Sequence, residues 1–124
     1  MIEFNNKKYN CLTEFTLDVI NGKWRVLIIW YLRNNVMRFG ELRKIIPGIT
    51  PKMLRQQLKE LEDFDIVRRE VFPQVPPRVE YSLTESGKTL YPVLDLMYDW
   101  AFKHISSNKE ANEEDMKEGS DKLA

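Results

Sequence analysis

The sequence predicts a mainly α-helical fold with one small β-hairpin, an α+β class, from three observations. Residues 51–63 read as a capped amphipathic helix that follows another short helix across a tight turn. The hydrophobic pattern then changes from helical to alternating over residues 66–83, which predicts two strands. A last long helix with a wide apolar stripe follows. The 124 residues correspond to one ordinary domain that can bury a core without disulfides or metal.

Residues 47–63, PGITPKMLRQQLKELED, carry clear signals for the start of a helix. Thr50 can cap the helix through its side-chain oxygen, Pro51 suits the first helical position, and Gly48 supplies the turn before it. At about 100° per residue, one stripe is apolar and the opposite face is polar. The apolar stripe consists of Leu54, Leu58 and Leu61. The polar face carries Lys52, Gln56 and Lys59, flanked by Met53 and Arg55.

No acidic residue occurs between Lys52 and Lys59, so this polar face offers Lys, Arg and Gln donors to a negatively charged partner. Arg and Lys pair with phosphates or guanine edges, and Gln can pair with adenine in the major groove. For a single helix of this composition, an ordinary solvated surface is the alternative. The segments on either side favour the nucleic-acid interpretation.

Three helices are predicted ahead of this segment, and the first is a short one that Thr13 could cap. The second runs from Lys23 or Trp24 to about Asn34, and Trp24 is expected to be a packing anchor because it lies on the apolar stripe. Its neighbours Lys23 and Arg25 are expected to be exposed. Residues 36–38 suggest a short strand, and residues 39–46 a short helix whose inward residues are Phe39, Leu42, Ile45 and Ile46. Two short helices joined by a tight turn with glycine, the second with a basic face, form a helix-turn-helix.

The strands expected after this motif cover residues 66–72 and 79–83. The segment PQVPPR between them is rich in proline, which cannot donate to a strand ladder, so it is expected to be a hairpin loop with Arg78 at its tip. A two-stranded ribbon directly after the second helix is a wing. The fold class is therefore a winged helix-turn-helix.

Thr84 is expected to cap the last helix, which Pro92 should kink or break in two. Its apolar residues recur at spacings of three and four and exceed what a small body can absorb. The candidates for a dimer interface are Leu90, Leu94, Met97, Tyr98, Ala101 and Ile105. The expected division is a flexible N-terminal arm over 1–10, the domain over 11–106 and a charged, disordered tail over 107–124.

The formal net charge is zero, but its distribution is uneven. Between Lys23 and Lys59, nine basic residues stand against Glu41 alone, whereas the segment from Lys109 to the end has a net charge of −3. The basic stretch predicts a local electrostatic footprint for nucleic acid. The single cysteine, Cys11, excludes an internal disulfide and indicates a reducing compartment.

No apolar run approaches the ~18 residues of a membrane span, and no signal sequence is visible, so a cytoplasmic protein without membrane contact is expected. No phosphate loop, dinucleotide fingerprint or metal-ligand spacing occurs, so neither a cofactor nor a metal is expected. A thiol enzyme that uses Cys11 would need a nearby base, and the only histidine, His104, lies at the far end of the chain. An enzyme is therefore not expected.

Three segments resemble one family: NGKWRVLIIWYL, RFGELRKIIPGITPKMLRQQLKELE and PPRVEYSLTESGKTLYPVLDLMYDW. Over Cys11 to Trp100 they are similar to the HxlR-type winged helix-turn-helix transcriptional regulators of bacteria. The resemblance implies a homodimeric, sequence-specific DNA-binding repressor or activator. It also implies that residues 50–63 form the recognition helix, residues 74–78 lie in the wing, and the terminal helices form the dimer interface.

In several members of this family a cysteine just before the first helix senses oxidants, quinones or aldehydes, and Cys11 stands at that position. The family commonly has proline next, where this chain has Leu12. A reactive thiol needs a pKa lowered by a helix N-terminus or by nearby cations, which Lys7 and Lys8 could supply. The alternative is an inert, partly buried cysteine. The resemblance thus makes Cys11 the redox-sensing candidate, with a small electrophile or oxidant as effector.

Two-fold symmetry then predicts a pseudo-palindromic double-stranded operator, with recognition helices in major grooves about 34 Å apart. The expected DNA contacts come mainly from residues 50–59, with Arg78 from the wing and Arg38 and Arg43 as weaker phosphate contacts beside Lys23 and Arg25. The full set of expected DNA contacts is Thr50, Lys52, Met53, Arg55, Gln56, Lys59, Arg78, Arg38 and Arg43. The competing interpretation is a winged-helix module that binds an acidic protein and not DNA.

Overall fold

The computed structural model describes residues 1–108, and the chain divides into two units, Met1–Lys88 and Thr89–Ala124. The last helix, α5 (Glu85–Asn108), begins in the first unit and continues in the second. The other helices are α1 (Leu12–Val19), α2 (Lys23–Leu32), α3 (Phe39–Ile45) and α4 (Pro51–Asp63). The strands are β1 (Ile2–Phe4), β2 (Lys7–Tyr9), β3 (Met37–Arg38), β4 (Val67–Phe72) and β5 (Arg78–Leu83).

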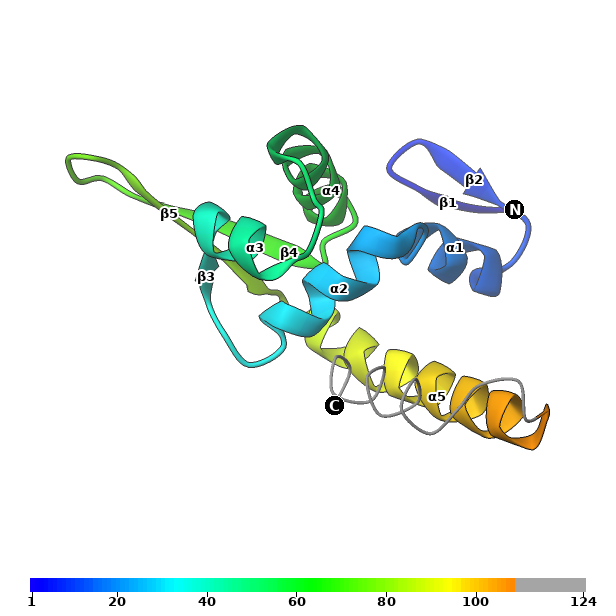
Figure 1. Ribbon diagram of the computed structural model, residues 1–124. Coiled ribbons are helices and arrows are strands. Elements are labelled where there is room, and N and C mark those ends of the chain that lie inside the picture. Colours follow the sequence, from blue (N-terminus) through cyan, green and yellow to red (C-terminus); the bar gives the residue numbers. More distant parts are fainter. Residues whose placement is uncertain (109–124) are drawn as a thin grey trace. The chain divides into compact units, whose positions relative to one another are not determined.

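The first unit is a winged helix-turn-helix, as predicted. A three-stranded antiparallel sheet has the order β3-β5-β4, and the β4-β5 hairpin extends past α3 and α4 (Figure 1). The hairpin register pairs Val67 with Leu83 at its base and Phe72 with Arg78 next to the loop. The short strand predicted near Met37 exists and pairs with β5 at Tyr81. The strand that directly precedes α3 therefore belongs to the same sheet as the two strands of the wing.

The core of the first unit lies where α2, α3 and α4 meet this sheet. Its largest fully buried side chains are Ile28, Ile29, Leu42, Ile46, Leu54, Leu58 and Leu61. Three of these belong to the predicted leucine stripe of α4, which is therefore confirmed. Ile45 was predicted to face inward but is 42% exposed, because α3 ends there and the chain turns Ile46 into the core instead.

The expectation of a flexible arm over residues 1–10 is wrong. Strands β1 and β2 form an antiparallel hairpin whose turn residues, Asn5 and Asn6, both have positive φ. Aromatic rings fix this hairpin to the body of the unit. Phe4 stacks on Phe64 with ring centroids 6.3 Å apart, and Tyr9 meets Phe15 edge-to-face at 5.3 Å. Residues 1–10 therefore pack on α1 and on the end of α4.

Thr84 caps α5 as predicted, because its Oγ1 accepts a hydrogen bond from the amide of Gly87 at 3.0 Å. The alternative in which Pro92 breaks the last helix into two parts is wrong, since α5 continues through Pro92 as a single helix. The helix extends to Asn108, two residues past the predicted end of the domain. The rest of the predicted tail, residues 109–124, lies outside the described residues.

Candidate nucleic-acid interface

The start of α4 is fixed by the residues that the sequence singled out. Thr50 Oγ1 accepts a hydrogen bond from the Met53 amide at 3.1 Å, and Pro51 occupies the first turn. Gly48 has a φ of +80°, a conformation that side-chain-bearing residues rarely adopt, so the turn before the helix requires glycine. The half-buried Trp24 of α2 reaches this turn, with Cη2 3.9 Å from the position that a Cβ on Gly48 would take. Its role is packing.

The leucine stripe decides which face of α4 is exposed. Leu54 and Leu61 are 0% exposed, so the opposite side of the helix must face outward. The exposed residues of the first two turns, preceded by the cap Thr50, are Lys52, Arg55, Gln56 and Lys59. Met53 is half-buried at the edge of this face. We call the surface formed by Thr50, Lys52, Arg55, Gln56 and Lys59 the α4 face. It carries three cations and no carboxylate.

The three cations of the α4 face differ in their partners. Lys59 Nζ lies 3.0 Å from Asp63 Oδ1, one turn further along, and this hydrogen bond raises the pKa of Lys59. The Arg55 guanidinium lies 5.5 Å from the centre of the Phe39 ring of α3, which orients its long side chain. Within residues 1–108, no carboxylate pairs with Lys52 or Arg55. Positive charge is therefore most available at the N-terminal half of the face.

Of the weaker candidates, Arg38 and Arg43 are exposed, as is Lys44, which the predicted contact set omitted. The amide of Arg38 donates to Glu41 Oε1 at 2.8 Å, which ties down the start of α3. Arg25, which was expected to be exposed, is only 8% exposed and is bonded to neighbouring helices. The prediction for Arg25 is wrong, so it cannot contact a phosphate.

The prediction that places Arg78 at the tip of the wing is wrong. Arg78 is the first residue of β5 and pairs with Phe72, while Val75 in the loop between them is fully exposed. The Arg78 guanidinium lies 4.1 Å from the centre of the Phe72 ring, and its Nε lies 3.3 Å from Glu80 Oε2 without hydrogen-bond geometry. The positive charge of Arg78 therefore interacts in part with Glu80 and Phe72 of the wing itself.

Sequence reasoning missed two exposed cations on β4, Arg68 and Arg69. Strand alternation places them on opposite faces of the sheet. Arg69 shares its face with the buried Val67, and therefore lies on the side that the helices cover. Two adjacent arginines in a strand next to a helix with a basic face were the signal that could have identified them.

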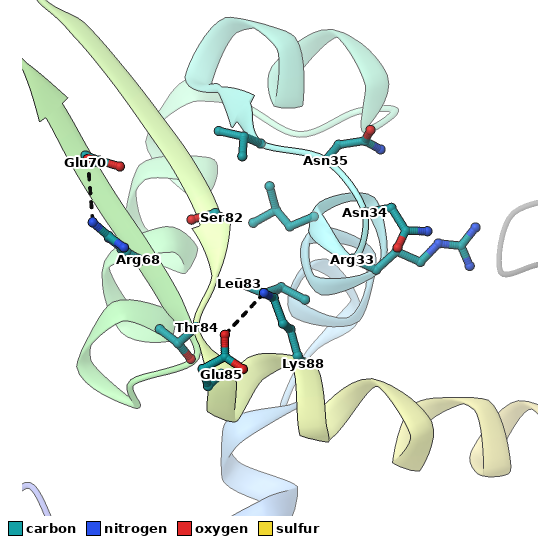
Figure 2. Close-up of a pocket in the computed structure, with 12 residues that line it drawn as sticks. Arg33, Asn34, Asn35, Arg68, Glu70, Ser82, Leu83, Thr84, Glu85 and Lys88 are labelled. Carbon is teal, nitrogen blue, oxygen red and sulfur yellow. Dashed lines mark hydrogen bonds and ion pairs between the residues drawn. The ribbon is translucent and has the colours of Figure 1, made fainter.

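Arg68 lies instead at a pocket of about 860 Å³ that is lined by residues of α2, the segment after it, β4, β5 and the start of α5 (Figure 2). In this pocket Arg68 lies 3.6 Å from Glu70, and Lys88 lies 3.3 Å from Glu85. Its lining residues are Leu32, Arg33, Asn34, Asn35, Val36, Arg68, Glu70, Ser82, Leu83, Thr84, Glu85 and Lys88. Opposite charges thus alternate in the pocket, unlike on the α4 face, and this distinguishes it from an anion-binding surface.

Cys11 is exposed at the N-cap position of α1, where its carbonyl accepts a 3.4 Å hydrogen bond from the amide of Phe15. It thus lies at a helix N-terminus, as predicted. Lys7, expected as a neighbouring cation, directs its amine to Asp18 Oδ2 at 3.4 Å. Within residues 1–108, no group of three or more His, Cys, Asp or Glu side chains could hold a metal ion, and no helix could cross a membrane.

In the second unit, α5 exposes many large apolar side chains. The six predicted interface residues divide by exposure: Met97 and Ile105 are exposed, Leu90, Tyr98 and Ala101 are half-buried, and Leu94 is 9% exposed. The exposed set also includes residues outside the predicted interface. These are Val93, Leu96, Trp100 and Phe102, of which Leu96 and Trp100 are each 68% exposed. The ring of Trp100 stacks on His104 at 4.9 Å.

Comparison with known proteins identifies this architecture. Residues 19–109 match the model of the HxlR-like helix-turn-helix family. YybR of Bacillus subtilis, an HTH-type transcriptional regulator, is 53% identical over 93 residues, which cover 75% of this chain and 74% of that protein.

Two solved structures are similar over most of the fold. The redox regulator HypR in its oxidized form is 53% identical, with a TM-score of 0.68 over 73% of this chain and 93% of that one. Diamide-treated YodB from B. subtilis is 38% identical, with a TM-score of 0.67 over 77% of this chain and 96% of that one. The winged helix-turn-helix geometry, the family match and these relatives agree: the chain belongs to the HxlR-like helix-turn-helix family of DNA-binding transcriptional regulators.

Proposed function

We propose that this protein regulates transcription as a cytoplasmic homodimer, with α4 of each protomer in the major groove of a pseudo-palindromic operator. The observation that carries the proposal is the exposed α4 face, which has three cations and no carboxylate and lies opposite a fully buried leucine stripe. B-DNA admits a helix in its major groove and carries a dense negative charge. The α4 helix has the shape that fits this groove, and the cations of the α4 face complement the negative charge of the DNA.

The role of each residue of the α4 face follows from the contacts that its side chain can make with DNA and from its ion pairs within the protein. Arg55 and Gln56 are adjacent, exposed and able to make bidentate contacts, so they read base edges, with Lys52 beside them. The Thr50 hydroxyl and Met53 lie at the end that enters the groove first. Lys59 shares its charge with Asp63 and serves as a phosphate contact. Arg38 and Arg43 add phosphate contacts from α3, and Arg78 acts from the wing once it leaves Glu80.

A homodimer explains the apolar surface of α5. The exposed side chains of Val93, Leu96, Met97 and Trp100 recur at spacings of three and four and therefore share one side of the helix. Exposed apolar patches of this kind mark interaction sites, and a self-complementary helix surface suits a two-fold interface. The two α4 helices would then lie about 34 Å apart, one turn of the duplex.

Redox or electrophile sensing through Cys11 completes the proposal. HypR is named a redox regulator, and YodB was crystallised after diamide treatment, which makes oxidation a relevant signal for this chain. The thiol is exposed at the N-cap position of α1, so an oxidant or electrophile can reach it from solvent. Because the chain has one cysteine, a disulfide requires a thiol from a second chain or a small thiol, while an electrophile could alkylate Cys11 directly.

The DNA-binding assignment is tested on a duplex selected from random sequences, by gel-shift titration at fixed salt. Arg55→Ala is expected to weaken operator binding by about 1–3 kcal/mol, and Lys59→Ala to weaken all DNA binding and reduce the salt slope by up to about 1. Lys8→Ala removes an exposed lysine from β2 and is the matched control. If Arg55→Ala behaves like Lys8→Ala, Arg55 does not read the operator. If the wild type lacks any steep salt dependence, the module binds a protein instead.

The dimer is tested by light scattering after gel filtration. Leu96→Glu places a charge on the exposed apolar surface of α5 and is expected to yield monomers that keep their helix content. Lys103→Glu changes an exposed residue of the same helix by two charge units and is expected to leave the dimer intact. A Leu96→Glu protein that stays dimeric at micromolar concentration would remove this surface from the interface.

The sensing role of Cys11 is tested with diamide and a quinone. The wild type is expected to change its operator affinity after either treatment, and thiol reduction should restore it after diamide. Cys11→Ser keeps the size of the side chain and should bind the operator equally before and after treatment. A Cys11→Ser protein that still responds would exclude Cys11 as the sensor.

A further inference from the structure

Arg25 is the one buried polar or charged side chain among residues 1–108, with 8% of its surface exposed. It lies in the first turn of α2, and its guanidinium bonds to two other helices. Nη1 donates to the backbone carbonyls of Asp18 at 2.7 Å and Val19 at 3.4 Å, at the end of α1. Nε donates to Gln57 Oε1 of α4 at 2.9 Å, and Nη2 pairs with Glu60. One side chain thus joins α1 to α4.

The contacts of Arg25 with α1 and with α4 each have a physical explanation. α1 has no basic residue in its last turn, so the guanidinium supplies positive charge where the helix dipole and the free carbonyls are negative. On α4, Gln57 and Glu60 are three residues apart and therefore lie on the same side of the helix. A lysine could not replace Arg25, because one ammonium cannot hold both the carbonyls and the α4 acceptors in the planar fork of a guanidinium.

Two contacts on one side of α4 restrict its rotation about its own axis. A helix with side chains has a radius of about 5–6 Å, so a rotation of about 20° moves an outward side chain by roughly 2 Å. Hydrogen bonds to base edges tolerate a few tenths of an ångström. The leucine stripe sets which face of α4 is outward, and the Arg25 contacts add a finer restraint on its rotation, on which contact of Arg55 and Gln56 with the bases depends.

At its other end, the Arg25 bridge contacts α1, the helix that begins after Cys11. Asp18, whose carbonyl accepts from Arg25, also accepts a hydrogen bond through its carboxylate from the Tyr9 hydroxyl at 2.7 Å. That bond fixes the end of α1 to β2, while Cys11 stands at the beginning of the same eight-residue helix. A displacement of α1 must therefore change the positions of the carbonyls that hold Arg25.

We propose that Arg25 is a positioning residue that sets the rotation of α4, and that it transmits a displacement of α1 at Cys11 to the DNA-reading face. The inference rests on the proposed function and adds the physical connection between its two sites. It assigns Arg25, Gln57 and Glu60 to regulation, although none of them faces the DNA.

Glu60 is the residue at which the bridge can be altered without an empty space in the core. Its side chain is 37% exposed and borders a pocket of about 460 Å³ whose other walls are formed by β1, the β1-β2 turn and the end of α4. Water can enter there, so Glu60→Gln, which has the same shape, is expected to fold. Arg25→Lys is the second variant, and Glu62→Gln makes the same charge change on α4 away from Arg25.

The sign of the effect separates positioning from general electrostatics. Glu60→Gln removes a negative charge from the DNA-binding helix, which by itself would strengthen binding to any DNA. Positioning predicts the opposite for the operator: about 10-fold weaker binding in Glu60→Gln and Arg25→Lys, with binding to random duplex unchanged or stronger. Glu62→Gln should keep the ratio of operator to random-duplex affinity within about twofold of wild type. All titrations are done at a temperature at which circular dichroism shows each variant fully folded.

A stabilising role alone would lower the unfolding temperature and leave this affinity ratio unchanged, and that result would overturn the inference. The connection to α1 is read in the free protein from backbone amide chemical shifts. Glu60→Gln is expected to shift the amides of Asp18 and Val19 as well as those of Lys52 to Gln56, and changes confined to the neighbours of residue 60 would overturn it.

The final measurement separates the inference from the proposed function on which it rests. In the wild type, diamide should change operator affinity, and in Glu60→Gln that change should shrink toward none while Cys11 reacts at the same rate. If the wild type does not respond to diamide, sensing through Cys11 fails, and the affinity ratio and chemical shifts still decide the positioning of α4. If wild type and variant respond equally, the transmission through Arg25 is refuted.

Discussion

Gly87 in the first turn of α5 is the position where the smallest substitution should have a large effect. A Cβ added there would lie 2.3 Å from the Ile66 carbonyl oxygen and 3.3 Å from both the Ile66 carbonyl carbon and Leu83 Cβ. Real Cβ atoms essentially never approach backbone below 3.0 Å. Gly87→Ala must therefore push the start of α5 away from Ile66, the residue before β4, by somewhat under 1 Å, since neither neighbour is the flexible end of a side chain.

The contacts that would be strained set the magnitude. The Ile66 carbonyl also accepts hydrogen bonds from Thr84, from its amide at 3.0 Å and its hydroxyl at 3.2 Å. Weakening both costs about 1 kcal/mol each, and overpacking typically adds about 1–3 kcal/mol. Alanine regains up to about 1 kcal/mol through its higher helix propensity. We expect Gly87→Ala to lower the free energy of unfolding by about 2–4 kcal/mol, and Tm by about 10 °C.

Urea and thermal unfolding followed by circular dichroism measure this effect. Gly40→Ala in α3 is the matched control, because a Cβ there meets nothing within 4 Å. It should be neutral or stabilise by up to about 1 kcal/mol. If Gly87→Ala unfolds at the same urea concentration as Gly40→Ala, the close approach of α5 to Ile66 is not a feature of the protein in solution.

Three further changes test the packing. Leu58→Ala removes a side chain that is 1% exposed and should lower the free energy of unfolding in urea by about 2–5 kcal/mol. Gly48→Ala strains a φ of +80° and should cost about 1 kcal/mol or more by the same measurement. The hydrogen bond to Asp18 raises the pKa of Tyr9 from 10.0 to about 12, so its stabilisation is complete below pH 10 and is lost as pH rises through 12. In Tyr9→Phe, thermal unfolding between pH 10 and 12 should lack this alkaline loss.

Local signals were sufficient to predict the helix-turn-helix and the wing. Thr50, Pro51 and the leucine spacing determine α4 within a stretch of 14 residues, and the prolines of the wing loop leave no other place for the turn between β4 and β5. These features need no knowledge of distant residues. The exposure of Lys52, Arg55 and Gln56 follows from the same spacing, because a buried stripe dictates the opposite face.

The N-terminal hairpin was missed although part of its signal was present. Asn5 and Asn6 are residue types that tolerate positive φ, and they stand between two short apolar-containing segments. Strands of three residues are too short for alternation to identify them. What stabilises the hairpin is the contact of Phe4 with Phe64, and a partner 60 positions away cannot be read from the local pattern.

The same limit applies to the charges of the site. Arg25 lies beside Trp24 on a helix whose pattern gave no reason to bury a guanidinium, and its burial depends on Glu60 of α4 and on the carbonyls of α1. Arg78 likewise is engaged by Phe72 and Glu80 across and along the wing. The sequence predicts the position of a basic residue along a helix or strand. The residue with which it pairs depends on how the helices and strands pack together.

This difference changes the electrostatics expected of the regulator. The nine basic residues from Lys23 to Lys59 suggest up to nine phosphate contacts per protomer, but Arg25 is buried, which leaves at most eight. Because each contact contributes about −0.9 to the slope of log affinity against log salt, the count of available cations and not of basic residues sets the salt dependence. Arg25 lies against α4 and bonds to Gln57, so part of the basic charge orients the reading helix instead of contacting DNA.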